Sequence, residues 1–174
     1  MSEEKVILVD KNDNQVGLMP KLEAHEKGVL HRAFSIFIFN SKYELLLQKR
    51  ASSKYHSGGL WTNTCCSHPR EGEDTLDAAN RRLDEEMGIK TSLRKVYDFI
   101  YKAELDNQLT EYELDHVFYG VFDKDPLLNK DEAEDFKWVD METLNNDIIK
   151  HEDNYTVWFK IAFEYFYNYL KKWK

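Results

Sequence analysis

TLDAANRRLDEEMG, residues 75–88, predicts a helix at 75–87 in the middle of a chain that is otherwise rich in strand patterns. Its residues are good helix formers, its entry is polar, and Gly88 provides a stop. Arg81, Glu85 and Glu86 fall near one another on its surface. Charges at this spacing usually form ion pairs on a solvated helix face. By itself, the segment therefore predicts a helix and no particular chemistry.

Strand patterns lie on both sides of this helix. Short apolar segments separated by turn residues predict strands at 5–10, 15–19, 32–40, 44–49, 60–64, 93–103, 112–122 and 136–139. Residues 155–173 place aromatic side chains at positions 155, 159, 163, 166 and 173, which form one face of a second long helix. We therefore expect an α+β fold, a mixed β-sheet flanked by helices, with N-terminal strands and a long C-terminal helix.

Size and charge limit the possible functions. A chain of 174 residues and 20.7 kDa without linkers predicts a single domain over residues 1–174. The formal net charge of −8 disfavours nucleic acid as a partner, because such binding needs a positive surface. No apolar run approaches the roughly 20 residues that cross a bilayer, and the start, MSEEKVILVD, lacks the basic segment of a secretory signal. We expect a cytoplasmic protein, monomer or homodimer, without a membrane partner.

The segment WTNTCCSHP, residues 61–69, holds the only two cysteines, Cys65 and Cys66. Adjacent cysteines close no useful loop, which argues against a structural disulfide. Histidine and glutamate, which are common metal ligands, occur close to these cysteines and elsewhere in the chain. Two of the glutamates, Glu111 and Glu113, share one face of a predicted strand. Imidazoles and carboxylates together suit a borderline divalent ion such as Mn, Zn or Fe. The candidate ligands are His25 in a predicted loop, His31 at a strand start, His68, Glu111 and Glu113. On spacing alone this set is a weak signal, because a histidine beside a strand is more often a surface or core residue than a ligand.

The central helix and the loop before it resemble an incomplete Nudix box, which in that family holds Mg²⁺ against a diphosphate. The matching positions are Glu73, Arg81, Glu85, Glu86 and Gly88. The opening glycine of the box is Ser67 here, and the glutamate expected after Arg81 is Arg82. Replacing that metal-binding glutamate by arginine is expected to make the box poor at hydrolysing diphosphates.

Five segments taken together resemble the type I isopentenyl-diphosphate isomerases, which are Nudix-fold enzymes. They are HEKGVLHRAF, QKRASSK, WTNTCCSHP, RRLDEEMG and EYELDHVFYG, in the order of that family and over nearly the whole chain. The resemblance implies interconversion of isopentenyl and dimethylallyl diphosphate for isoprenoid biosynthesis. The expected partner is therefore a small allylic or homoallylic diphosphate.

The resemblance also implies roles for individual residues. Cys66 and Glu113 would be the acid/base pair, Tyr101 would assist proton transfer, and Trp158 would face the developing carbocation. The five candidate ligands would hold Mn²⁺ or Zn²⁺, and Glu86 would bind Mg²⁺ carried by the diphosphate. The phosphate oxygens would contact four cations, Lys21, Arg50, Lys54 and Arg82. Asp115, His56, His116 and His151 match no functional position.

Two other functions compete with this one. An ordinary Nudix diphosphohydrolase is disfavoured by Arg82 and by the Cys66/His68 motif. A non-enzymatic module with a structural zinc site at Cys65, Cys66 and His68 is disfavoured because adjacent cysteines rarely both reach one tetrahedral ion. Chelation that unfolded the chain would favour the zinc module.

Overall fold

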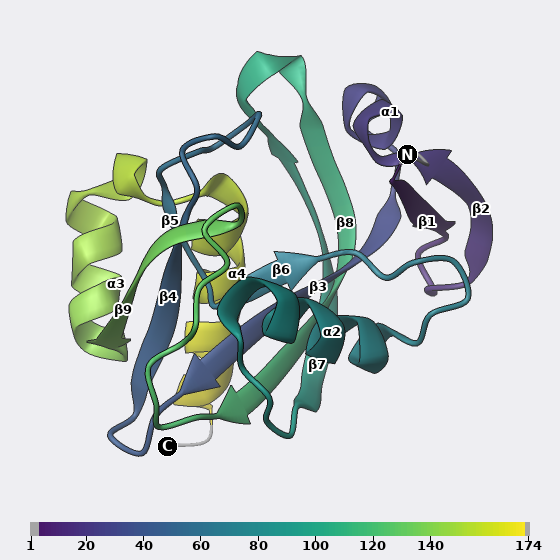
Figure 1. Ribbon diagram of the computed structural model, residues 1–174. Helices are drawn as coiled ribbons and strands as arrows, with labels where there is room; N and C mark the ends of the chain where they lie inside the picture. Colours follow the sequence, from purple (N-terminus) through teal and green to yellow (C-terminus); the bar gives the residue numbers. More distant parts are fainter. Residues whose placement is uncertain (1–3, 173–174) are drawn as a thin grey trace.

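The computed structural model describes residues 4–172, and its centre is a mixed β-sheet (Figure 1). Strand β3 (His31–Phe39) runs parallel to β8 (Thr110–Val121), and β7 (Arg94–Glu104) pairs antiparallel with the far side of β8. The β3–β8 pairing sets His31 opposite Glu113. Residues far apart in sequence are thereby brought together at one end of the sheet.

Shorter strands extend the sheet around β3. An N-terminal hairpin of β1 and β2 pairs with the start of β3, while β4, which follows β3, carries β5 and β9 along its length. Strand β6 pairs with β3 and places Cys66 opposite Ser35. The bounds are β1 Lys5–Val9, β2 Gln15–Pro20, β4 Glu44–Arg50, β5 Trp61–Thr62, β6 Cys65–Ser67 and β9 Ala133–Asp140.

Helices cover both faces of the sheet. Helix α2 (Thr75–Met87) lies in front of the sheet in Figure 1, and α4 (Val157–Lys171) lies behind it. The short helix α1 (Lys21–Lys27) follows the N-terminal hairpin, and α3 (Met141–Lys150) follows β9. Single 3₁₀ turns occur at Asp106–Gln108 and Glu152–Asn154.

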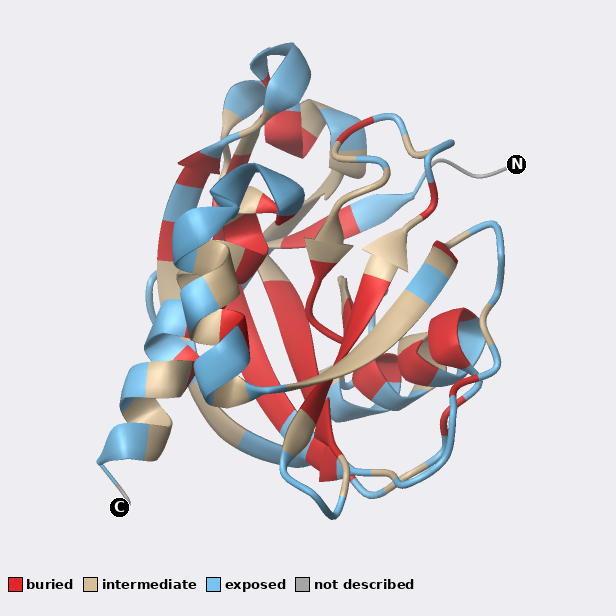
Figure 2. Ribbon diagram, turned by 90° about the vertical axis from the view of Figure 1, so that its left-hand side faces the viewer, coloured by how far each residue is buried: buried red, intermediate tan, exposed pale blue. Residues whose placement is uncertain are grey.

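Alternation along β3 explains this layered arrangement, because successive side chains of a strand point to opposite faces. Phe37 and Phe39 belong to the core cluster under α4, where the ring of Phe37 stacks on Phe166 with centroids 4.3 Å apart. Phe34, Ile36 and Ile38 belong to the cluster under α2. Figure 2 shows the buried strands between helices whose outer faces are exposed. A strand that is apolar on both faces must be covered on both, and this one is.

Helix α2 begins and ends where its sequence predicts. Asp74 is the N-cap, and its carboxylate accepts hydrogen bonds from the backbone of Leu76 and Asp77. Gly88 ends the helix in the left-handed conformation, with φ of 62°. The space beside Gly88 is closed, since an added Cβ would lie 2.8 Å from Leu127. The glycine is therefore required both by conformation and by packing.

The predicted fold class is confirmed, with differences in particular elements. Neither α1 nor α3 was predicted, and His25 lies in helix α1 instead of a loop. Of the strand predicted at 60–64, only Trp61–Thr62 (β5) is a strand, because Asn63 and Thr64 turn their side chains to buried backbone groups. Strand β6 (Cys65–Ser67) begins after the predicted range. The last helix begins at Val157, and the predicted position 173 lies outside the described residues. Within 4–172, no helix has both the length and the apolar character needed to span a membrane.

Candidate active site

A cavity of about 390 Å³ opens beside β6 and the ends of β3 and β8. Of the residues expected at the site, only His31 does not line it, because its ring is fully buried behind the wall. The expected residues that line the cavity are Lys21, His25, Arg50, Lys54, Cys66, His68, Arg82, Glu86, Tyr101, Glu111, Glu113 and Trp158. The structure therefore brings the predicted residues together.

Three histidines and one carboxylate form a compact group at the inner end of the cavity. His25, His31, His68 and Glu113 each offer one ligand atom, and these atoms lie within 4.8 Å of one another. Each comes from a different element or loop: α1, the start of β3, the loop after β6, and β8. Glu111, also expected as a ligand, is outside this group.

The surroundings of the imidazoles suit metal binding. The Nδ1 atoms of His25 and His31 lie 2.7 and 2.8 Å from the carbonyl oxygens of Lys21 and Val29. A carbonyl can only accept, so each Nδ1 carries the proton and each Nε2 keeps a free lone pair. His31 Nε2 is buried without a hydrogen-bond partner among the described residues. A ring nitrogen that has a free lone pair and lies close to three other ligand atoms fits a divalent ion.

His25, His68 and Glu113 are in the protonation states that a metal needs. Burial lowers the pKa of His68 to about 4, although Glu113 opposes this shift. Burial likewise lowers the pKa of His25. For Glu113, burial would raise the pKa, but the imidazoles of His31 and His68 beside its carboxylate outweigh burial and hold the pKa well below the usual range. Neutral imidazoles and an ionised carboxylate are the forms that bind cations.

Tyr101 links the two carboxylates. Its hydroxyl lies 2.7 Å from Glu113 Oε2 and 2.9 Å from Glu111 Oε2. One hydroxyl donates a single proton, so the second contact is satisfied only if the other carboxyl is protonated. Burial, followed by the charge of Glu113, raises the pKa of Glu111 well above its ordinary value. The arrangement is a neutral Glu111, an ionised Glu113, and Tyr101 between them.

The two cysteines, both free, face in opposite directions from β6. Cys66 lines the cavity, whereas Cys65 is fully buried in the core under α2. Adjacent strand residues point to opposite faces, so the two thiols do not converge on one tetrahedral ion. Burial raises the pKa of the Cys66 thiol, with Arg50 partly opposing it, so the thiol holds its proton at neutral pH.

Trp158 forms an aromatic wall of the cavity and is 4 % exposed. The guanidinium carbon of Arg50 lies 5.0 Å from the indole centroid, and the ring of His56 meets the indole edge-on at 5.6 Å. Burial, followed by the charge of Arg50, lowers the pKa of His56 to about 3 and keeps that ring neutral. No motif in the sequence indicated that His56 would contact the site.

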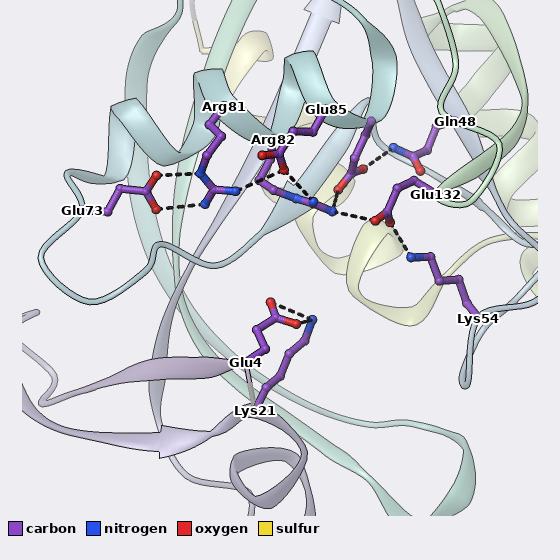
Figure 3. A network of polar contacts seen from close by, with 10 residues as sticks. Glu4, Lys21, Gln48, Lys54, Glu73, Arg81, Arg82, Glu85 and Glu132 are labelled. Atoms are coloured by element: carbon purple, nitrogen blue, oxygen red, sulfur yellow. Dashed lines mark hydrogen bonds and ion pairs between the residues drawn. The ribbon is translucent and has the colours of Figure 1, made fainter. Parts of the chain in front are cut away.

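Most of the expected phosphate-binding cations already hold acidic partners (Figure 3). Lys21 pairs with Glu4 at 3.3 Å, Lys54 pairs with Glu132, and Arg82 contacts Glu85 at 2.8 Å and Glu86 at 2.6 Å. Arg50 donates to the carbonyl oxygen of His56 at 3.4 Å. The cavity is thus a site of alternating charge, more acidic than the sequence suggests.

Glu86 lies at the end of α2 with both carboxylate oxygens in use. Oε1 pairs with Arg82, and Oε2 accepts from Gln48 at 2.9 Å. A carboxylate oxygen has a second lone pair, so Glu86 can still ligate Mg²⁺ from the cavity side. The cavity is also lined by two positions of the box, Ser67 and Arg81. Lining residues to which the sequence assigned no role are Glu4, Lys5, Phe34, Ser35, Tyr55, His56, Arg70 and Glu132.

Residues 29–159 match the NUDIX domain family. Among solved structures, a crystal structure from Deinococcus radiodurans aligns with a TM-score of 0.71 and 20 % identity, covering 85 % of this chain and 90 % of that one. A MutT protein from Methanosarcina mazei aligns with a TM-score of 0.66 and 23 % identity, covering 82 % and 96 %. These likenesses place the chain in the Nudix fold, whose members use divalent metal ions.

Curated relatives narrow the assignment. The isopentenyl-diphosphate Delta-isomerase 2 of Photorhabdus laumondii is 58 % identical over 91 % of this chain and 89 % of its own length. The isopentenyl-diphosphate Delta-isomerase of Pectobacterium atrosepticum is 47 % identical over 98 % and 95 %. The chain belongs to the isopentenyl-diphosphate Delta-isomerase family.

Proposed function

We propose that this protein is an isomerase that interconverts isopentenyl and dimethylallyl diphosphate by proton transfer at carbon. The observation that supports this most directly is the shared cavity of Cys66, Tyr101 and Glu113. It combines a protonated thiol with an ionised carboxylate, which is the pairing that an allylic shift requires. Family membership supplies the substrate.

The reaction needs one proton added and one removed. The Cys66 thiol donates its proton to the terminal alkene carbon, which places positive charge on the neighbouring tertiary carbon. Glu113 then takes a proton from the next carbon, and the electron pair of that C–H bond forms the new double bond. The net result is that one proton has moved from Cys66 to Glu113. Proton exchange returns both groups to their starting states before the next turnover. General acid–base catalysis of this kind contributes roughly 10²–10⁴-fold in rate.

Neighbouring residues support each step. The Tyr101 hydroxyl donates to Glu113 Oε2 and orients that carboxylate. The indole face of Trp158 stabilises positive charge on the substrate carbon by roughly 0.5–2 kcal/mol. The buried walls exclude water, which would otherwise trap the carbocation.

The metal ions have separate positions. His25, His31, His68 and Glu113 would hold Mn²⁺ or Zn²⁺, with Glu111 joining if its side chain turns from Tyr101. Such an ion orders the carboxylate pair and stabilises the negative charge on it. Glu86 would bind Mg²⁺ that arrives with the diphosphate, while Lys21, Arg50, Lys54 and Arg82 contact the phosphate oxygens.

Proton and phosphorus NMR of isopentenyl diphosphate in deuterated water, with Mg²⁺ and Mn²⁺, tests this function. We expect dimethylallyl diphosphate that carries deuterium, with the diphosphate signals unchanged. Loss of the diphosphate signals would instead indicate a diphosphohydrolase. No reaction with any divalent metal under reducing conditions would contradict the isomerase assignment.

A further inference from the structure

Glu132 is an acidic residue placed among cations by segments that carry no motif. It lies directly before β9, and its backbone is fixed beside the end of β4: the amide of Ala51 donates to Glu132 O at 3.0 Å. The Glu132 amide in turn donates to Asn129 O at 3.0 Å. Its side chain lines the cavity and is 22 % exposed. The position is therefore set by the sheet, independently of the carboxylate's own contacts.

The carboxylate bridges two of the expected phosphate-binding cations. Oε2 accepts a hydrogen bond from Lys54 Nζ, and Oε1 lies 3.2 Å from Arg82 Nη2 (Figure 3). Lys54 comes from the loop after β4 and Arg82 from α2. Burial would raise the pKa of Glu132, but the hydrogen bond from Lys54 and the charge of Arg82 outweigh it and lower the pKa. Glu132 is thus ionised while it holds both cations.

We propose that Glu132 is a positioning residue that presents Lys54 and Arg82 as a preformed pair to the diphosphate. This inference rests on the proposed function. Two cations at one anion site repel each other, and a lysine ammonium on its flexible stem otherwise extends into water. A carboxylate between them cancels the repulsion and fixes the lysine before substrate arrives. The ordering cost is then met during folding, which strengthens binding.

Donor counting shows that the bridge leaves the cations able to bind phosphate. Lys54 has three N–H donors and uses one on Glu132. Arg82 has five and uses three of them, on Glu85, Glu86 and Glu132. The contacts of Glu132 with Lys54 and Arg82 therefore do not have to break when the diphosphate binds.

The test compares Glu132→Gln with wild type in two measurements. The first is calorimetric titration of each protein with inorganic diphosphate in the presence of Mg²⁺, and the second is steady-state kinetics with isopentenyl diphosphate. We expect Kd and KM to rise roughly tenfold, which corresponds to ~1.4 kcal/mol, while kcat changes little because the acid/base groups are untouched. Lys54→Met should also weaken binding. In the double variant the two losses should be less than additive, because Glu132 acts in part through Lys54 and in part through Arg82.

Asp131→Asn is the matched control. It removes one negative charge a single residue away, at an exposed position that is not among the residues lining the cavity. Its Kd should equal that of wild type. If Glu132→Gln unfolds, Glu132→Asp provides the same comparison, because its shorter side chain cannot bridge both cations.

Three outcomes would overturn the inference: unchanged Kd in Glu132→Gln, tighter binding that marks Glu132 as a competing anion, or additive losses in the double variant. Each leaves the isomerase function standing if wild type converts isopentenyl diphosphate. Failure of wild type to convert it would instead refute the proposed function.

Discussion

Cys65 and Cys66 are chemically identical, yet their surroundings separate them into a core residue and a reacting group. Cys66 reaches the cavity, whereas Cys65 packs among the apolar side chains under α2. The difference arises from strand alternation and from nothing in the thiols themselves.

Replacing each cysteine by alanine should therefore give opposite phenotypes. We expect Cys66→Ala to lower kcat by at least roughly 10²–10⁴-fold, because the proton donor is lost, with little change in the Kd for diphosphate. Cys65→Ala should retain most turnover and lose about 1 kcal/mol of stability through a small cavity. Kinetics, diphosphate titration and urea unfolding measure these effects. Wild-type turnover in Cys66→Ala would refute its assignment as the proton donor.

The lowered pKa of His56 predicts how the stability of the protein depends on pH. Because its pKa is lowered to about 3 in the folded protein, it does not affect stability above its ordinary pKa of ~6.5. Below that value the unfolded chain takes up a proton that the folded protein refuses, so stability falls from about pH 6.5 down to pH 3. We expect the free energy of unfolding of His56→Gln to decline less steeply over this range.

Urea unfolding at several pH values is the measurement. Identical slopes for wild type and His56→Gln would show that the folded protein protonates His56 at the ordinary pH.

At the scale of elements, propensity and periodicity predicted the long helices and most strands, but not α1 or α3. Helix α3 does carry a local signal, the N-cap Asp140, whose carboxylate accepts from Thr143 N. Helix α1 has only seven residues and follows a proline without a side-chain cap. Its sequence, KLEAHEK, is too short to be stable alone. Docking against β8 and the hairpin fixes it, and it carries His25 into the cluster. No local pattern contains that information.

Two glycines that flank helix α2 separate the effects of backbone conformation and steric crowding on the free energy of unfolding. Gly72 and Gly88 both have positive φ, of 74° and 62°. An added Cβ would meet nothing within 4 Å at Gly72, but would lie 2.8 Å from Leu127 at Gly88. We expect Gly72→Ala to cost about 1–2 kcal/mol of unfolding free energy. Gly88→Ala should cost about 1–3 kcal/mol more, because the backbone and side chain of Leu127 must also shift.

Urea unfolding of both variants tests this difference. Equal losses would mean that Leu127 moves aside without cost. A larger loss in Gly72→Ala than in Gly88→Ala would contradict the packing around the cap.

For the molecule as a whole, the candidate metal ligands His25, His31, His68 and Glu113 are separate from the hydrophobic core clusters. The core clusters lie under α2 and α4, whereas the imidazoles gather at the end of the sheet beside α1. We expect a strong chelator to abolish turnover while far-UV circular dichroism stays native, and added Mn²⁺ to restore activity. A small fall in Tm should accompany metal loss, since bound ligands stabilise the folded state. Global unfolding on chelation would instead favour a structural zinc module.

The contents of the site were predictable only where residues formed motifs. Cys66, His68 and Glu113 fall in recognisable segments, and the structure places them at one cavity. Glu4, His56 and Glu132 do not, because the β1–β2 hairpin, the loop after β4 and the segment before β9 bring them in through tertiary packing. The carboxylates of Glu4 and Glu132 add negative charge to a cavity that the resemblance alone would have described as basic.

The parallel pairing of β3 with β8 also has a consequence for synthesis on the ribosome. Ser35 and Asp115, which are hydrogen-bonded across it, are 80 positions apart. Strand β3 is buried along nearly its whole length, so a nascent chain that ends before β8 presents this apolar strand without its central neighbour. Non-local pairings of this kind form slowly and leave partly made chains prone to aggregation. We expect truncations before β8 to require chaperones for solubility, while the full-length chain refolds unaided.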